Sequence, residues 1–348
     1  MGFMGLLTGC AGVEELAIDC LHPAEVSFPA ELRRVAIANN TPTPPGLRAV
    51  QPEPADKRNR ATYYDGDVGI AAEALAKAIA EWDYFDEVII CDSALRTHDQ
   101  QERKVMLTPD EVNRLANEML ADVIVALEAL PIRTEEHFDY LPNEELYEGA
   151  LDVKVYPIVR LYVPGRAGPM ATLLATDSIY WEKVGATPDD IREELAEEID
   201  LIGESSRFAA TAIMGRLLPC WRETERQLFV GGNVDMRDGA VYARRGQWAE
   251  AINVWKRAFN ERKSKAQRIR AAHNTAIGYE MMDSISAALD WAGQAVSLSD
   301  EHYGKPANDP MRDNPTALLV HEYREQLIKR KAEFAVLSAQ MRRYNNED

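Results

Sequence analysis

Two sets of residues in this sequence could carry chemistry, and the first is a group of polar side chains at helical spacing. Arg244, Arg270, His273 and Asn274 fall on what would be the inner faces of two neighbouring helices. Guanidinium and amide donors of this kind bind peptide carboxylates by charge-assisted hydrogen bonds. They predict a groove that binds a protein or peptide. An equally weighted alternative is that two helical pairs form no deep groove, so that these residues face the acidic N-terminal part of the chain.

The second set comprises the residues that an enzyme or a metal centre would use. None of the four cysteines forms a CxxC pair, and no histidine lies at zinc-ligand spacing from them. There is no Gly-rich phosphate loop, and Ser205-Ser206 lacks the GxSxG pattern. His98-Asp99 and Glu135-Glu136-His137 could each form an acid–base pair, but neither has a nucleophile beside it. We therefore expect no catalytic residue, no metal and no cofactor.

A different kind of chemistry is predicted at the N-terminus. Residues 1–9 are small and apolar and lead into Leu7-Thr8-Gly9-Cys10, which resembles the bacterial lipobox. In that motif the cysteine receives diacylglycerol, so lipidation at Cys10 would anchor the protein to a membrane that it does not span. Without this processing the protein would be cytoplasmic. We expect residues 1–30 to form this leader and an extended tether, because Pro23 and Pro29 prohibit a helix.

Charge divides the rest of the chain into two parts. The net charge of the 348 residues is −18, but residues 232–348 hold 18 Lys and Arg against 16 Asp and Glu, which leaves −20 on the first 231 residues. This asymmetry predicts an acidic domain at 31–231 and a separate domain at 232–348. A surface as acidic as the first one repels phosphate, so nucleic acid is not expected as its partner.

The acidic domain has the pattern of an α/β fold with a mixed sheet. Short apolar runs at 34–39, 87–91 and 122–127 predict strands. Helices are expected between them, one capped by Asp67 and one starting at the capping box Thr108-Pro109-Asp110-Glu111. This β-α-β-α-β order predicts parallel pairing of the three strands.

The second half of the acidic domain predicts antiparallel structure. Apolar and polar residues alternate over 152–164 and 171–181, which indicates a long hairpin. A single long helix is expected from Thr187 to Leu217. A last strand at 224–230 is expected to close the domain.

From Gly231 the sequence changes to a helical repeat pattern. Small and aromatic residues recur at the spacing of tetratricopeptide repeats, in which small residues let paired helices approach closely. The first unit comprises Gly239, Tyr242, Gly246, Trp248, Ala251, Trp255 and Ala258. The second follows 37 residues later with Ala276, Tyr279, Asp283, Ile285, Ala288 and Ala295. A long helix that starts at Asn314-Pro315 is the expected terminal cap.

The whole layout resembles a family of uncharacterised lipoproteins of Bacteroidetes-type bacteria. The residues that carry the resemblance are Leu7–Cys10, the Leu21-His22-Pro23-Ala24-Glu25 segment, residues 33–40, and Gly246-Gln247-Trp248-Ala249-Glu250-Ala251 with Trp255. The order of elements in the first domain is also similar to that of envelope lipoproteins of the curli-secretion and penicillin-binding-protein-activator kind. The resemblance implies a location in the cell envelope and no particular activity.

Together these patterns predict a non-enzymatic lipoprotein, facing the periplasm from the outer membrane, that acts as an adaptor or assembly factor for a protein partner. Two alternatives remain open at this point. One is a hydrolytic enzyme with its site in a 131–150 loop near His137. The other is a cytosolic regulator of the repeat type that carries no lipid.

Overall fold

The computed structural model describes residues 12–41, 60–91, 94–96, 106–307, 309 and 312–344, and the chain divides into two compact units. The α/β unit contains Ala24–Cys220 and the end of the chain from Gln340. The helical unit contains Trp221–Ala339 together with the N-terminal segment up to Pro23. An α/β part followed by a helical part is therefore confirmed, but the division falls about ten residues earlier than the sequence pattern placed it.

The α/β unit is built on a five-stranded sheet with the order β4-β2-β5-β8-β9. Its strands are β2 (Arg34–Asn39), β4 (Glu87–Ile90), β5 (Val123–Ala129), β8 (Ile158–Tyr162) and β9 (Ala171–Leu174). As predicted, β2 pairs in parallel with both β4 and β5, while β8 and β9 add to the sheet antiparallel. The central strands consist of continuous runs of apolar residues, because helices cover both faces of the sheet.

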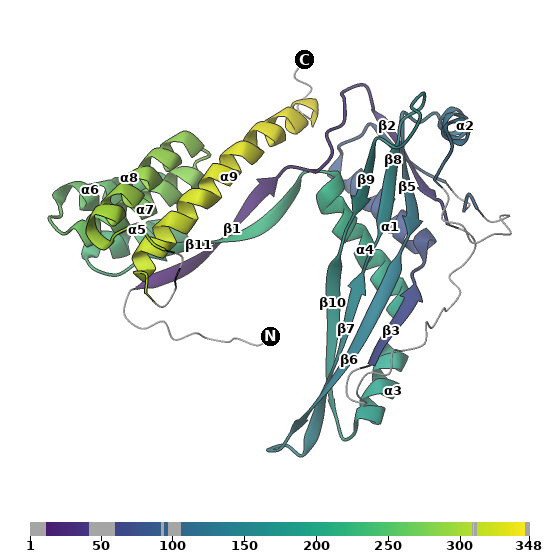
Figure 1. Cartoon of the computed structure of the whole chain (residues 1–348), viewed down its shortest axis with the longest axis horizontal. Helices are drawn as coiled ribbons and strands as arrows, with labels where there is room; N and C mark the ends of the chain where they lie inside the picture. Colours follow the sequence, from purple (N-terminus) through teal and green to yellow (C-terminus); the bar gives the residue numbers. More distant parts are fainter. Residues whose placement is uncertain are drawn as a thin grey trace. The chain divides into compact units, whose positions relative to one another are not determined.

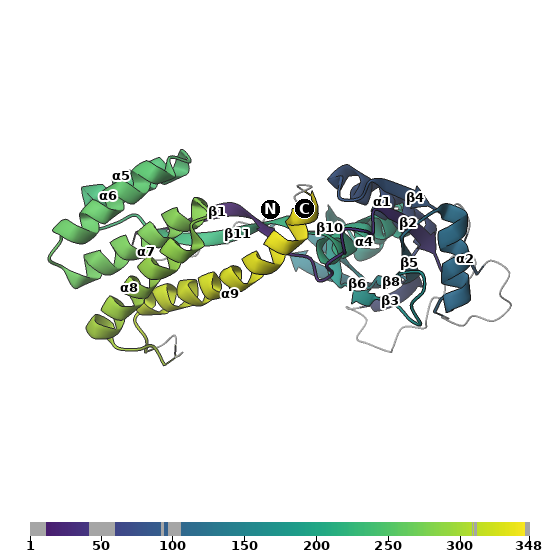
Figure 2. The same ribbon diagram turned by 90° about the horizontal axis from the view of Figure 1, so that it is seen from above.

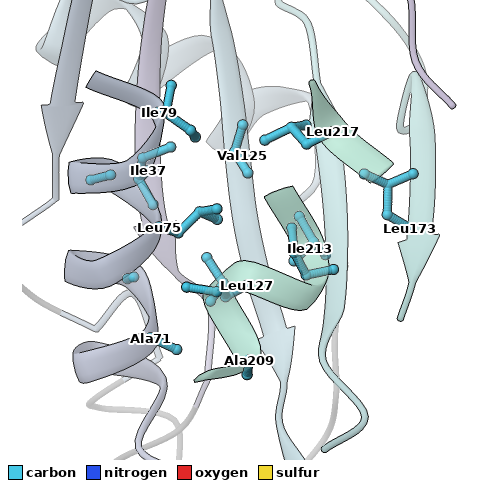
Figure 3. Packing of buried hydrophobic residues seen from close by; sticks show 14 of the residues in the cluster. Ile37, Ala71, Leu75, Ile79, Val125, Leu127, Leu173, Ala209, Ile213 and Leu217 are labelled. Atoms are coloured by element: carbon cyan, nitrogen blue, oxygen red, sulfur yellow. The ribbon is translucent and has the colours of Figure 1, made fainter. Parts of the chain in front are cut away.

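Three helices cover the two faces of this sheet. Helices α1 (Val68–Trp82) and α4 (Leu201–Leu217) pack on one face, where Leu75, Ile79 and Ile213 meet the strands (Figure 3). Helix α2 (Pro109–Met119) packs on the other through a smaller apolar cluster. Both predicted caps are present: Asp67 accepts from the amide of Ile70, and Thr108 and Glu111 form the capping box.

A second, antiparallel sheet has the order β10-β7-β6-β3. It consists of β3 (Arg60–Asp65), β6 (Pro131–Leu141), β7 (Leu146–Val155) and β10 (Asp177–Gly185), with α3 (Pro188–Glu198) against its inner face. One prediction fails here, because the segment 131–150 is a β-hairpin and not a loop. The antiparallel pairing predicted for 152–164 with 171–181 is confirmed in a single register, from Val155 with Asp177 to Leu161 with Ala171, but its two ends lie in different sheets. Residues 158–162 pair with β9, whereas the end of β7 pairs with β10.

The predicted helix from Thr187 to Leu217 is also interrupted. Ile199 has extended backbone angles, and the Asp200 side chain accepts a hydrogen bond from the amide of Gly203. A new helix therefore begins at Leu201, because this cap satisfies an amide that has no partner within the first turn.

The helical unit contains α5 (Val234–Arg244), α6 (Trp248–Glu261), α7 (Lys265–Met281), α8 (Ile285–Tyr303) and α9 (Pro315–Tyr344), seen in Figures 1 and 2. The first four form two helical pairs whose turns repeat each other 37 residues apart. Gly246 and Asp283 both have left-handed backbone angles, with φ of 70° and 53°. Each turn is closed by the same three backbone hydrogen bonds, to Tyr242 and Ala243 in one and to Tyr279 and Glu280 in the other. None of the helices in the described part of the chain has both the length and the hydropathy needed to cross a membrane.

Strands β1 (Val13–His22) and β11 (Cys220–Phe229) form a separate two-stranded sheet, here called the ribbon, beside α9 (Figures 1 and 2). Gly12 accepts hydrogen bonds from the amides of Val230 and Gly231, so the start of β1 lies at the end of β11 and the strands are antiparallel. The predicted extended tether is thus a paired strand over residues 13–22. The predicted last strand does not close the α/β unit, because its partner is β1.

The tight contact of α5 with α6 gives a direct test of this packing. A methyl group added at Gly239 would lie 2.1 Å from the Trp255 indole nitrogen, whereas one added at Gly293 of α8 would meet nothing within 4 Å. We expect Gly239→Ala to lower the free energy of unfolding by about 1–3 kcal/mol through overpacking. Gly293→Ala, the matched control, should leave it unchanged or raise it by up to about 1 kcal/mol. Urea unfolding followed by far-ultraviolet circular dichroism checks this, and equal stability of the two variants would contradict the close approach.

Candidate binding site in the helical unit

The four residues predicted to line a groove are brought together by the structure, but they face the ribbon. Arg244 forms a two-pronged ion pair with Glu14 of β1, in which Nε lies 2.6 Å from Oε1. The Arg270 guanidinium lies over the ring of Phe229, 5.5 Å from its centre. Both cations thus contact segments of the same chain.

Asn274 and His273 bind the backbone of β11 directly. The Asn274 side chain donates to the carbonyl of Phe229 at 2.8 Å and accepts from its amide at 3.0 Å, which are the bonds that a neighbouring strand would make. His273 Nε2 lies 2.8 Å from the carbonyl oxygen of Gln227. Both side chains are fully buried. All four predicted residues therefore contact the ribbon of the same chain, and β11 occupies the inner face of α7.

The ribbon and α9 are joined to α7 by a buried ionic cluster centred on Glu280. Arg226 of β11 donates to both carboxylate oxygens of Glu280, at 2.9 and 2.8 Å. From α9, Arg330 donates at 2.6 Å and the Tyr323 hydroxyl at 2.9 Å. Glu280 is entirely buried and Arg226 almost so. One carboxylate therefore connects three elements that are distant in the sequence.

The cluster is charged in the folded protein. Burial by itself would raise the pKa of Glu280, but the hydrogen bonds and charge of Arg226, with Arg330 and Tyr323, hold this pKa below its usual value. Burial, and then the charge of Glu280, raise the pKa of Tyr323 well above its usual range, so the hydroxyl keeps the proton that it donates. Two guanidinium groups around one carboxylate leave a net positive charge at the base of the site.

A pocket of about 550 Å³ opens over this cluster, between the ribbon and α9. Arg226, Tyr323 and Arg330 form its base. Its lining also includes more acidic than basic residues, namely Glu223, Glu225, Glu322 and Glu333 with Lys329. The remaining lining residues are Cys20, His22, Thr224, Gln227, His273, Leu319 and Gln326.

Most of these residues were not singled out from the sequence. One signal for Glu280 was present, because the repeat offset of 37 residues aligns it with Ala243 of the first helical pair. A charged residue at a position that the first helical pair fills with alanine indicates a specialised partner. Arg226 and Arg330 gave no comparable signal, since each lies in an element that contains several other charged residues.

The residues considered for catalysis lie elsewhere. His137 is on β6, and its Nε2 lies 3.2 Å from an oxygen of Asp152 on β7, with both side chains about 40% exposed. Glu135 and Glu136 bind Arg133 and Arg192, so neither orients His137. His98-Asp99 and the predicted lipidation site Cys10 lie outside the described residues. Over the ranges that the structure describes, no three His, Cys, Asp or Glu side chains come together as a metal site would need.

Comparison with known protein families identifies both parts of the chain. A family model described as Domain of unknown function (DUF8603) matches residues 32–229, more than half of the sequence. The chain belongs to this family. In this DUF8603 protein a second model, Domain of unknown function (DUF6340), matches residues 237–329, which run from α5 into α9. A search of curated proteins finds no match.

The chemistry of the pocket in this DUF8603 protein favours binding. Arg226, Arg330 and Glu280 satisfy one another's charges and hydrogen-bonding groups. Burial raises the pKa of the Cys20 thiol, although Arg330 Nη1 lies 2.9 Å from its sulfur. A thiol kept protonated in this way is a poor nucleophile. What remains for a ligand is a cleft with a charged wall and fixed hydrogen-bonding groups.

His273 makes the stability of this site depend on pH. Burial lowers the pKa of His273 from 6.5 to about 4, so between these values the unfolded chain binds more protons than the folded one. Stability attributable to His273 is therefore complete above pH 6.5 and is lost as the pH falls. From pH 7 to pH 5 the loss should be about 2 kcal/mol. In urea unfolding at pH 7 and pH 5, wild type should lose this stability and His273→Gln should not. The exposed His302→Gln should behave as wild type does. A pH dependence unchanged in His273→Gln would contradict the assignment.

Proposed function

We propose that this protein is a non-enzymatic adaptor or assembly factor that binds a protein partner through its helical unit. The helical pairs are proposed to be of the tetratricopeptide type. In support, the turns at Gly246 and Asp283 share their backbone angles and hydrogen bonds. Gly239, one of the small residues of the pattern, also lies directly against Trp255. Modules of this type bind extended polypeptide segments.

The observation that carries the proposal is that side chains of α7 bind the backbone of an extended strand. Asn274 pairs with the amide and the carbonyl of Phe229, and His273 binds the carbonyl of Gln227. Contacts of this kind recognise an extended backbone and do not depend on a particular side chain. Because β11 fills this position, the surface left for a partner in the described part of the unit includes the pocket between the ribbon and α9.

The proposed location is the cell envelope, with the protein held by a lipid on Cys10 and facing the periplasm from the outer membrane. The lipobox at Leu7–Cys10 is the support for this address. A cytosolic regulator is the alternative if Cys10 is not processed. The hydrolase alternative has less support, because the His137 and Asp152 pair is half exposed on a sheet face.

Partner binding is tested by placing a photoreactive amino acid at Lys329, which lines the pocket and is 80% exposed. The matched control is the same substitution at Lys263, an exposed residue between α6 and α7. In cells that express the full-length protein, we expect crosslinking to one defined protein from Lys329 and none from Lys263. Cys10→Ala should move the adduct from the membrane fraction to the soluble fraction.

The captured protein is then purified and its affinity measured. We expect Lys329→Glu to weaken binding by about tenfold, with Lys263→Glu unchanged, because only the first alters charge at the pocket. Identical crosslinking from the two positions, or identical affinities of the two charge variants, would reject the pocket as the site of partner binding.

A further inference from the structure

The outer edge of β1 is a strand edge that pairs with no other strand in the part of the chain that the structure describes. Gly12 accepts from the amide of Val230, so even-numbered residues of β1 direct their backbone groups toward β11. The backbone groups of Val13, Glu15, Ala17, Asp19 and Leu21 consequently point the other way. Among the described residues, none donates to or accepts from the backbone of these five.

The other edge of β11 confirms this orientation. Asn274 bonds to the amide and the carbonyl of Phe229, an odd-numbered residue of β11. Its odd-numbered residues therefore face α7, and its even-numbered residues face β1. The order across this part of the unit is α7, then β11, then β1, which leaves the far edge of β1 on the outside.

This edge lacks two of the usual protections against further pairing, and the charged residues that it carries are all acidic. Natural edge strands are often short, or carry a proline, a lysine or a bulge that prevents addition of another strand. Strand β1 has ten residues and contains neither proline nor lysine. Its open edge, from Val13 to Leu21, is about 30 Å long at the usual rise per residue.

The charge beside this edge is of one sign. The odd-numbered side chains of the ribbon form its exposed face, which carries Glu15 and Asp19 on β1 and Glu223 and Glu225 on β11. No Lys or Arg occupies an odd-numbered position of either strand. Opposite charges on neighbouring strands stabilise their pairing, and like charges destabilise it. A second copy of β1 would place acidic residues against acidic residues.

We propose that the outer edge of β1 binds an extended, basic segment of another protein, which adds to the ribbon as a third strand. Alternate residues of that segment are Lys or Arg and lie beside Glu15 and Asp19. The residues between them are apolar, because they point to the face on which Ile18 and Cys20 are buried. This inference rests on the proposed adaptor function and specifies where the partner binds and what its chemistry is.

The test uses two synthetic ten-residue peptides, one in which Lys alternates with Val and one in which Glu alternates with Val, each with a fluorescent label. Fluorescence anisotropy measures their affinity for the full-length protein. We expect the Lys peptide to bind at least about tenfold more tightly than the Glu peptide. N-methylation of alternate amides should abolish its binding, because the inter-strand hydrogen bonds are lost.

Two variants of one exposed residue test the edge itself. Ala17→Pro removes an outward-facing amide and places the proline ring on the edge, a position where a proline is compatible with the strand. Ala17→Val keeps the amide and is the matched control. We expect about tenfold weaker binding of the Lys peptide by Ala17→Pro and no change by Ala17→Val. Equal affinities would overturn the proposal.

A charge reversal keeps the proposal testable if Ala17→Pro disturbs the fold. Glu15→Lys with Asp19→Lys leaves the backbone edge intact and should invert the preference toward the Glu peptide. A preference that stays the same would overturn the proposal. Dimerisation of the wild type that Ala17→Pro abolishes would also overturn it, because the occupant would then be a second copy of the chain.

The outcome is separable from that of the adaptor proposal. If the protein captured at Lys329 binds Ala17→Pro as well as Ala17→Val, the edge assignment fails and the adaptor function stands. If the peptides behave as expected but Lys329 captures no protein, the pocket assignment fails and the edge remains a binding site for a basic strand.

Discussion

The helical unit depends on one buried carboxylate. Glu280 receives four hydrogen bonds from two arginines and a tyrosine, and these donors come from a strand before the helices and from the last helix after them. Removing one member of a buried ionic cluster is costly, because the remaining charges lose their partners while still out of water. We infer that this cluster, more than any other contact, fixes the positions of β11 and α9 on α7.

This interaction also determines which surfaces are open. With Arg226 held by Glu280, β11 lies along the inner face of α7 and covers the face that the sequence predicted to be a binding groove. The adjacent strand β1 is held through its own contacts with Arg244 and Arg330. In the described part of the unit, the surfaces that remain open include the pocket between the ribbon and α9 and the outer edge of β1. The ribbon, assembled from segments about 200 residues apart, thus both covers one surface and presents another.

The sequence was informative wherever the pattern was local. The capping box at Thr108, the buried strands and the two helical pairs were all predicted, since each depends on residues within one or two turns. The failures share a different cause. Strand β6 lies in a half-solvated sheet and carries charged residues on both faces, and β1 pairs with a strand that follows it by about 200 residues. Nothing in the ten residues of β1 specifies that partner.

The same difference between local patterns and tertiary contacts applies to the candidate site. Helical periodicity predicted a common face for Arg244, Arg270, His273 and Asn274, and in the structure all four contact the ribbon. What covers that face is a tertiary property, and the covering strand had been assigned to the other domain. Arg226 and Arg330 became recognisable only through Glu280, which the repeat offset alone distinguishes from its counterpart Ala243.

The most direct test of the central role of Glu280 is hydrogen–deuterium exchange of the β11 amides in Glu280→Gln, with Glu322→Gln on the pocket wall as the matched control. Loss of the charge leaves Arg226 and Arg330 without their carboxylate, a change that costs about 3–5 kcal/mol in buried clusters. Protection of the amides in Cys220–Phe229 should then fall by about a hundredfold or more in Glu280→Gln and stay unchanged in Glu322→Gln. Equal protection in the two variants would show that the ribbon is held by other contacts and would contradict this account.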